Sequence, residues 1–209
     1  MKKIVAIDPG LQNTGFASVE FGEDGKVTDM RLLRFPVCSR DSMDLISLAK
    51  EFEDNIPLDV LGEIGDADIV LLEDQKAADR KMNHVMAHWL RTIPPHSQCE
   101  IVAPQSRSAY ARRVLDEPIK KVSYRENKKR SIRAVHRLFP HIQLPKKEDD
   151  VADALLMCLM RGGYKLSSAS DSGFSFSSSS SSVSAADARR SSLLVQSMLS
   201  QTDTGKGKT

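Results

Sequence analysis

Residues 3–17, KIVAIDPGLQNTGFA, decide the fold, because they join two short apolar runs through a turn. Residues 4–7 predict a strand that ends at Asp8, since the Pro-Gly pair that follows breaks regular strand pairing. Residues 14–21 predict an antiparallel partner strand, in which Gly15 leaves space for the close approach of backbone or ligand. The prediction is a hairpin with a carboxylate at its end, although Asp-Pro-Gly is also ordinary turn chemistry.

Further segments predict an α/β fold. Strands are predicted at 27–35, 67–74 and 99–103, and helices at 40–56, 76–92, 106–115, 125–139 and 148–161. The strand 67–74, ADIVLLED, is a continuous apolar run that ends in acids, so Glu73 repeats the geometry of Asp8. Two such acids side by side are costly without a cation between them. Taken alone, Glu73 is equally well explained as a solvated strand end.

The last predicted helix begins with a cluster of acids, in KKEDDVADALL at residues 146–156. The helix dipole explains Asp149 or Asp150 near the N-terminus. It does not explain Asp153, because a carboxylate within an Ala/Leu run loses hydration unless a positive charge meets it. Asp153 shares a helix face with Asp150, three residues away, and with Asp149, four residues away. Asp153 can therefore act together with Asp150 on this face, or with Asp149 as the alternative to Asp150.

Composition limits the class of protein. The chain has 209 residues, of which 40% are hydrophobic and 28% charged, as in a globular protein with one substantial core. We expect a soluble, intracellular protein with no membrane association, because the first apolar run is short and no segment approaches the ~20 apolar residues that span a bilayer. The three cysteines have no spacing typical of disulfides or zinc sites.

The net charge of +2 conceals a marked asymmetry. Residues 1–103 contain 11 Lys/Arg and 18 Asp/Glu, whereas residues 104–147 contain 13 and 3. A basic block of this size favours contact with a polyanion, and aromatic rings among the cations are typical of nucleic-acid binding. The candidate DNA-binding residues are Lys120, Lys121, Tyr124, Arg125, Lys128, Lys129, Arg130 and Arg133.

Serine dominates the C-terminal part of the chain, with an unbroken run at residues 177–182. Such a tract buries too little apolar area to offset its conformational entropy. We therefore expect a folded domain at residues 1–163 and a disordered tail at residues 164–209.

Three motifs, IDPGLQNTGFA, LLEDQ and KKEDDVADALL, resemble those of the RuvC-like Holliday junction resolvases, which belong to the ribonuclease H-like nucleases. The Lys-Lys-acid form of the last motif is most similar to the resolvases of poxviruses and other large DNA viruses. The resemblance covers about residues 3–161. It implies a ribonuclease H-like α/β fold, with a central mixed five-stranded sheet flanked by helices.

The resemblance also implies an activity, that of a crossover junction endodeoxyribonuclease. Family members act on four-way DNA junctions in recombination and replication, as homodimers that make paired nicks with 5′-phosphates. Asp8, Glu73, Asp150 and Asp153 would bind two Mg²⁺ or Mn²⁺ ions, which prefer such oxygen ligands. A nearby lysine is expected to assist, and the choice stays open among Lys120, Lys121, Lys128 and Lys129. If the viral resemblance holds, the protein acts where viral DNA replicates.

Three alternatives remain. An ATPase of the actin and Hsp70 type also begins with an Asp-x-Gly hairpin, but no glycine-rich loop follows Glu73. A DNA-binding module without catalysis would use the acids only as helix caps. Another ribonuclease H-like nuclease, acting on RNA–DNA hybrids or as a transposase, would use the same chemistry on a different substrate.

Overall fold

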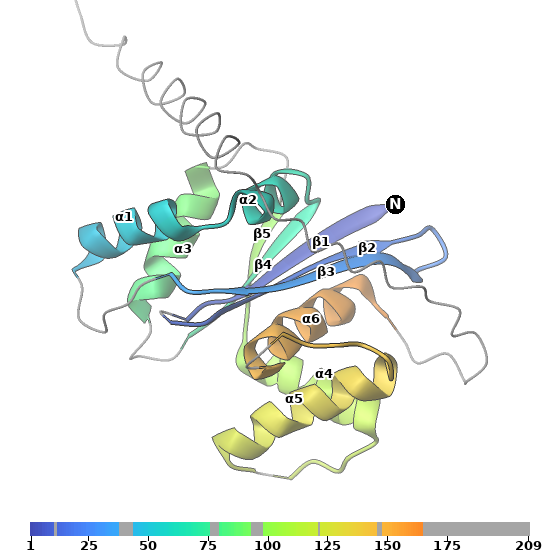
Figure 1. Cartoon of the computed structure of the whole chain (residues 1–209). Helices are drawn as coiled ribbons and strands as arrows, with labels where there is room; N and C mark the ends of the chain where they lie inside the picture. Colours follow the sequence, from blue (N-terminus) through green and yellow to red (C-terminus); the bar gives the residue numbers. More distant parts are fainter. Residues whose placement is uncertain are drawn as a thin grey trace, which may run out of the picture. The chain divides into compact units, whose positions relative to one another are not determined.

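The computed structural model describes residues 1–10, 12–37, 44–75, 80–92, 98–120, 122–145 and 148–164 (Figure 1). The strands are β1 (Lys2–Asp8), β2 (Thr14–Phe21), β3 (Val27–Phe35), β4 (Ile69–Glu73) and β5 (Gln98–Val102). The helices are α1 (Leu45–Asn55), α2 (Leu58–Gly65), α3 (Arg80–Thr92), α4 (Pro104–Leu115), α5 (Tyr124–Leu138) and α6 (Glu148–Gly162).

The strands form one five-stranded sheet in the order β3-β2-β1-β4-β5. β1 pairs antiparallel with β2, and β2 pairs antiparallel with β3. β1 also pairs parallel with β4, and β4 pairs parallel with β5. The predicted mixed sheet and the predicted hairpin are therefore confirmed, and β1 lies at the centre of the sheet.

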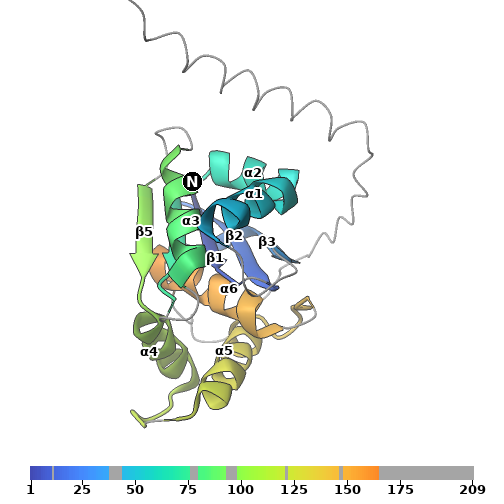
Figure 2. The ribbon, with the colours of Figure 1, turned by 90° about the vertical axis from the view of Figure 1, so that its left-hand side faces the viewer.

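Helices cover both faces of the sheet, because both faces of its central strands are apolar. Ile4 and Ala6 of β1 belong to a core with α4, α5 and α6, whereas Val5 and Ile7 belong to a second core with α1, α2 and α3. This alternation follows from the two-residue period of a strand. Figures 1 and 2 show the two helical layers on opposite sides of the sheet.

Helix α6 is deeply buried, since residues 151–159 are all inaccessible to solvent. It packs on β1 and β2, where the Cys158 thiol donates to the carbonyl oxygens of Ile4 (3.4 Å) and Ala17 (3.5 Å). Gly15 permits this approach. A Cβ atom at Gly15 would lie 2.2 Å from the carbonyl oxygen of Asp150. The predicted close approach at Gly15 is confirmed, and the partner is the first turn of α6.

Helix α2 is not among the elements predicted from the sequence, which assigns no element to residues 58–65. The two glycines in LDVLGEIG lower its helix propensity, and burial of Val60 and Ile64 stabilises the helix instead. Other expectations lie outside the described residues: the starts of the helices predicted at 40–56 and 76–92, and the tail from residue 165 onward. Among the described helices, none combines the length and apolar character needed to cross a bilayer.

Candidate functional site

Three carboxylates from distant parts of the chain meet at one end of the sheet. Asp8 follows Ile4 and Ala6 on the α6 face of β1, and Glu73 follows Ile69 and Leu71 on the same face of β4. The two strands are parallel and in register, so their terminal acids are neighbours. Asp153 projects from the second turn of α6. One oxygen of each carboxylate lies within 4.8 Å of the others.

All three carboxylates are shielded from water. Asp8 and Glu73 are 4% exposed, and Asp153 is 0% exposed. A cluster of three buried acids is unfavourable without cations, because burial and mutual repulsion both oppose ionisation. Two basic side chains therefore enter the cluster.

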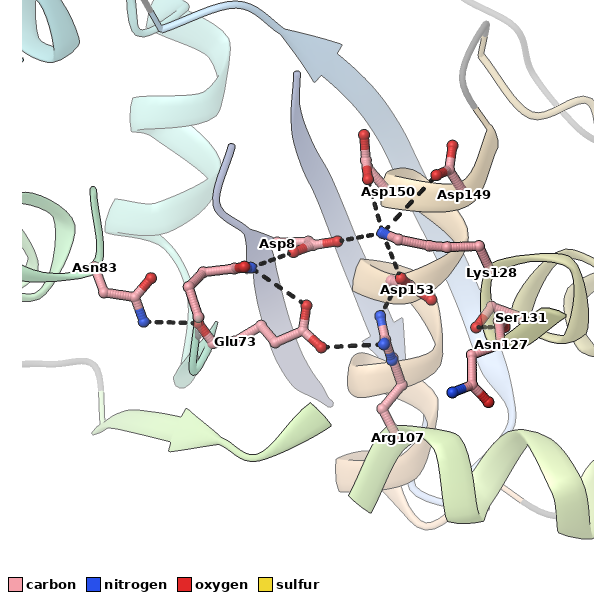
Figure 3. Close-up of polar contacts among 11 residues, drawn as sticks. Asp8, Glu73, Asn83, Arg107, Asn127, Lys128, Ser131, Asp149, Asp150 and Asp153 are labelled. Atoms are coloured by element: carbon pink, nitrogen blue, oxygen red, sulfur yellow. Dashed lines mark hydrogen bonds and ion pairs between the residues drawn. The ribbon is translucent and has the colours of Figure 1, made fainter. Parts of the chain in front are cut away.

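Lys128 of α5 is the first of these cations (Figure 3). Its Nζ lies 2.8 Å from Asp150 Oδ1, 2.8 Å from Asp153 Oδ2 and 3.4 Å from Asp8 Oδ2. Among the candidate lysines that the structure describes, contact with the acids therefore favours Lys128. Lys128 also links Asp150 to the cluster of Asp8, Glu73 and Asp153, although the oxygens of Asp150 are not part of that group of three.

Arg107 of α4 is the second cation, and it bridges Glu73 and Asp153, the second of which also contacts Lys128. Its Nη2 lies 3.2 Å from Glu73 Oε1, and its Nη1 pairs with Asp153 Oδ2. The residue is 6% exposed. The expected positive partner of Asp153 is therefore present, in the form of both Arg107 and Lys128.

Two amide side chains complete the surroundings of Asp8 and Glu73. Gln75 Nε2 donates to Asp8 Oδ1 at 2.8 Å and to Glu73 Oε2 at 3.5 Å. Asn83 Nδ2 of α3 donates to the backbone carbonyl of Glu73 at 2.9 Å. The Gln75 bonds therefore restrain the carboxylates of Asp8 and Glu73, and the Asn83 bond restrains the backbone at the end of β4.

The protonation behaviour of the cluster follows from its burial. Burial, together with Glu73, raises the pKa of Asp8 well above its usual range, against the opposing effect of Lys128. Burial also raises the pKa of Asp153, although Arg107 and Lys128 act in the other direction. Burial alone would lower the pKa of Lys128, but Asp8, Asp153 and Asp150 outweigh it and raise the pKa. The lysine therefore stays charged, whereas Asp8 and Asp153 ionise less readily than exposed carboxyl groups because their pKa values are raised.

The donor set fits a hard divalent cation. All three groups offer carboxylate oxygens, which suit Mg²⁺ or Mn²⁺. The buried Asp153 Oδ1 has no hydrogen-bond partner among the residues that the structure describes. A buried carboxylate oxygen without a partner is costly, and a metal ion would satisfy it. Asp8, Glu73 and Asp153 could therefore hold a metal.

The contacts of Asp149 and Asp150 indicate which of them is the fourth acid beside Asp8, Glu73 and Asp153. Lys128 Nζ lies 3.9 Å from Asp149 Oδ2, a longer distance than the 2.8 Å to Asp150 Oδ1. The Asp149 side chain is 35% exposed and that of Asp150 is 19% exposed. The geometry favours Asp150 as the fourth acid.

A cavity of about 770 Å³ opens over the acids. Its lining includes Asp8, Glu73, Arg107, Lys128 and Asp150. The lining also includes exposed side chains, namely Ile119 (91% exposed), Tyr124 (76% exposed) and Lys120. The Tyr124 ring centroid lies 5.7 Å from Lys128 Nζ. An aromatic face and a cation thus stand beside the acids, where a nucleotide could reach all of them.

The structure divides the remaining DNA-binding candidates into two groups. Lys120, Tyr124, Arg125 and Lys129 are exposed, and Lys121 lies outside the described residues. Arg130 is only 4% exposed, and its Nε donates to Glu117 at 2.7 Å. Arg133 is exposed as well, but it pairs with Glu117 at 2.8 Å and with Glu126 at 2.9 Å. The last two arginines thus connect α5 to the segment after α4.

Arg107, Gln75 and Asn83 did not emerge as candidates from the sequence. A signal for Arg107 does exist. It lies three, four and seven residues before Tyr110, Ala111 and Val114, which form the buried face of α4. A charged residue on an apolar helix face indicates a buried partner of opposite charge.

Comparison with known proteins adds evidence of a different kind. The model of the family described as Poxvirus A22 protein matches residues 2–162. A search of curated proteins gives no match. Among solved structures, a fowlpox virus resolvase in complex with Holliday junction DNA aligns with a TM-score of 0.52 and 17% identity, over 78% of this chain and 99% of that chain. A T. thermophilus RuvC in complex with a Holliday junction substrate aligns with a TM-score of 0.48 and 12% identity, over 77% and 92%. The fowlpox match shows a shared fold.

Proposed function

The chain belongs to the Poxvirus A22 protein family, a family of Holliday junction resolvases, and we propose that it is a metal-dependent endonuclease that resolves four-way DNA junctions. The observation that carries the proposal is the convergence of Asp8, Glu73 and Asp153 in one buried cluster beneath a cavity with basic walls. The products would be paired nicks with 5′-phosphates, made by a homodimer during recombination or replication of DNA.

The acids would hold the metal. Asp8, Glu73, Asp150 and Asp153 are the proposed ligands of two Mg²⁺ or Mn²⁺ ions. The chemistry supplied by two such ions, when bound, would be activation of a water and stabilisation of charge on the leaving 3′ oxygen. Gln75 would orient Asp8 and Glu73 through its amide group.

Lys128 would act on the substrate. Its ammonium group lies among the acids and stays protonated, so it can donate hydrogen bonds to a phosphate that enters the cavity. The scissile phosphate would thereby gain a positive partner as negative charge builds up during hydrolysis. The acid cluster and this lysine come from four different elements, which fixes their geometry through the fold.

Cleavage of an immobile four-way junction in the presence of Mg²⁺ tests the proposal. We expect paired nicks near the branch point, with little cleavage of linear duplex or of an RNA–DNA hybrid under the same conditions. EDTA should abolish the reaction. Equal cleavage of the hybrid would indicate a general ribonuclease H, and metal-independent binding without nicking would indicate a DNA-binding module.

The exposed basic residues near the cavity are expected to bind phosphates. Changing Lys120, Arg125 and Lys129 together to glutamine should weaken junction binding, because fewer phosphates are neutralised and fewer counterions are released. The slope of log affinity against log salt should become shallower by roughly 1 for each phosphate that is no longer neutralised. Fluorescence anisotropy at several salt concentrations measures this slope.

A matched control is Lys26→Gln. Lys26 is exposed in the β2–β3 turn, at the end of the sheet remote from the acids. This variant should keep both the affinity and the salt slope. An unchanged slope in the triple variant would remove these residues from the DNA interface.

A further inference from the structure

Arg107 is a buried cation held by two of the proposed metal ligands, and the nuclease proposal leaves it without a role. It reaches Glu73 on β4 and Asp153 on α6 through two different nitrogens (Figure 3). These two acids come from different layers of the fold. A single planar guanidinium therefore ties together the strand and the helix that carry them.

The position of Arg107 is unusual for a purely structural ion pair. Its Nε is buried and has no hydrogen-bond partner among the described residues. A buried arginine with an unpaired donor is unfavourable in free energy. Unlike lysine, arginine cannot relieve this cost by losing a proton. The positive charge is therefore permanent.

The formal charges of the cluster show the effect of the permanent positive charge on Arg107. Asp8, Glu73, Asp150 and Asp153 together carry four negative formal charges, and Lys128 and Arg107 supply two positive ones. The remaining two negative charges favour the binding of divalent cations. Without Arg107 the excess of negative charge would be larger, and Glu73 and Asp153 would repel each other without a partner.

We propose that Arg107 is a positioning residue that holds Glu73 and Asp153 together before metal binds, and that it weakens metal binding by competing for the same oxygens. The inference rests on the proposed metal-dependent function. It predicts a trade-off: Arg107 makes the metal-free protein more stable, and it lowers the affinity of the protein for the metal.

The test uses the full chain without DNA and two substitutions of the same residue. Arg107→Gln removes the charge, and Arg107→Lys keeps the charge but loses the fork that reaches both acids. Mn²⁺ binding is measured by electron paramagnetic resonance or calorimetry, and the melting temperature is measured in EDTA and in Mn²⁺. Arg112→Gln is the matched control, because Arg112 lines the same cavity and no contact with the three acids is found among the described residues.

We expect Arg107→Gln to bind Mn²⁺ about tenfold more tightly than the unchanged protein, since a competing charge is removed. Its melting temperature in EDTA should fall by about 10 °C, because removing one partner leaves buried charges unpaired. Mn²⁺ should restore most of that loss. Arg107→Lys should keep the original Mn²⁺ affinity within about threefold and still melt earlier in EDTA. Arg112→Gln should change neither quantity.

Three results would overturn the inference. Equal or weaker Mn²⁺ binding by Arg107→Gln would refute competition. An unchanged melting temperature in EDTA would refute the holding role. Equally strong effects in Arg112→Gln would show that general charge, and not contact with the acids, is responsible. Absence of Mn²⁺ binding by the unchanged protein would instead refute the metal proposal, and the EDTA melting data would still test the holding role.

Discussion

Replacing Asp8 by asparagine is expected to reduce junction cleavage by roughly 10³-fold or more, while junction binding stays within about threefold. The amide has almost the same shape but lacks the negative charge that a divalent ion requires. Glu73→Gln and Asp153→Asn should behave in the same way. Single-turnover cleavage with saturating Mg²⁺ measures the rate, and anisotropy in Ca²⁺ or EDTA measures binding.

The loss of activity should not come from unfolding. The folded-state pKa of Asp8 is raised by burial and by Glu73, so folding favours the protonated carboxyl group over the ionised one. For such a group, stability decreases as pH rises through the range between the unfolded and folded pKa values. At pH values above the unfolded pKa, Asp8 therefore destabilises the metal-free protein. Asp8→Asn should melt at the same temperature or higher in EDTA.

Asp149→Asn provides the matched control for this series. Asp149 is on the same helix turn as Asp150, but it is more exposed and lies farther from Lys128. The Asp149 variant should retain most of its cleavage rate, and Asp150→Asn should lose it. The opposite result would assign the fourth ligand position to Asp149. Normal cleavage by the Asp8 variant would remove the metal cluster from the mechanism.

Gly15→Ala is expected to have the second large effect, on stability and on catalysis together. The added Cβ would lie 2.2 Å from the carbonyl oxygen of Asp150, 2.4 Å from its carbonyl carbon and 2.9 Å from the Val151 nitrogen. All three atoms belong to backbone, and β2 is held between β1 and β3. Helix α6 must therefore shift, and Asp150 and Asp153 shift with it.

Overpacking of this kind costs about 1–3 kcal/mol and sometimes more, so the urea midpoint should decrease. Cleavage should fall because the distance between Asp153 and the two strand-end acids changes. Gly62→Ala is the control, since a Cβ atom at Gly62 meets nothing within 4 Å and the residue lies in α2. That substitution should stabilise the protein by about 0.5–1 kcal/mol. A Gly15 variant with normal stability and activity would contradict the close approach of α6.

Much of the site could be predicted because its acids stand at positions where the surrounding sequence is apolar. Asp8 and Glu73 end apolar strands, and Asp153 interrupts an apolar helix face, so each needs an explanation that its own segment does not supply. Their meeting then follows from the parallel pairing of β1 with β4 and the packing of α6. The nuclease role of these residues stays a prediction.

The cations could not be predicted in the same way. Lys128 lies in a segment rich in positive charge, where nothing in the local sequence distinguishes a buried cation from an exposed one. The same applies to Arg130, which the sequence groups with the DNA-binding candidates and which is buried against Glu117. Arg107 has only the indirect signal of its place on the apolar face of α4, which does not identify its acidic partners. Only the packing of α4, α5 and α6 decides which of these side chains face inward. Helix α2 has no clear signal in the sequence, because its stability comes from burial and not from propensity.

The in-register pairing of β1 with β4 limits the positions at which this chain can tolerate insertions and deletions. Inserting or deleting one residue within either strand, between the paired Ile4 and Ile69 and the terminal acids, would turn Asp8 or Glu73 to the opposite face of the sheet. A two-residue change would restore the face but move the carboxylate along the strand by about 7 Å. Insertions in the loops that connect these strands carry no such restriction. Engineered fusions or tags should therefore be placed in loops such as the β2–β3 turn, where the spacing of the acids is unaffected.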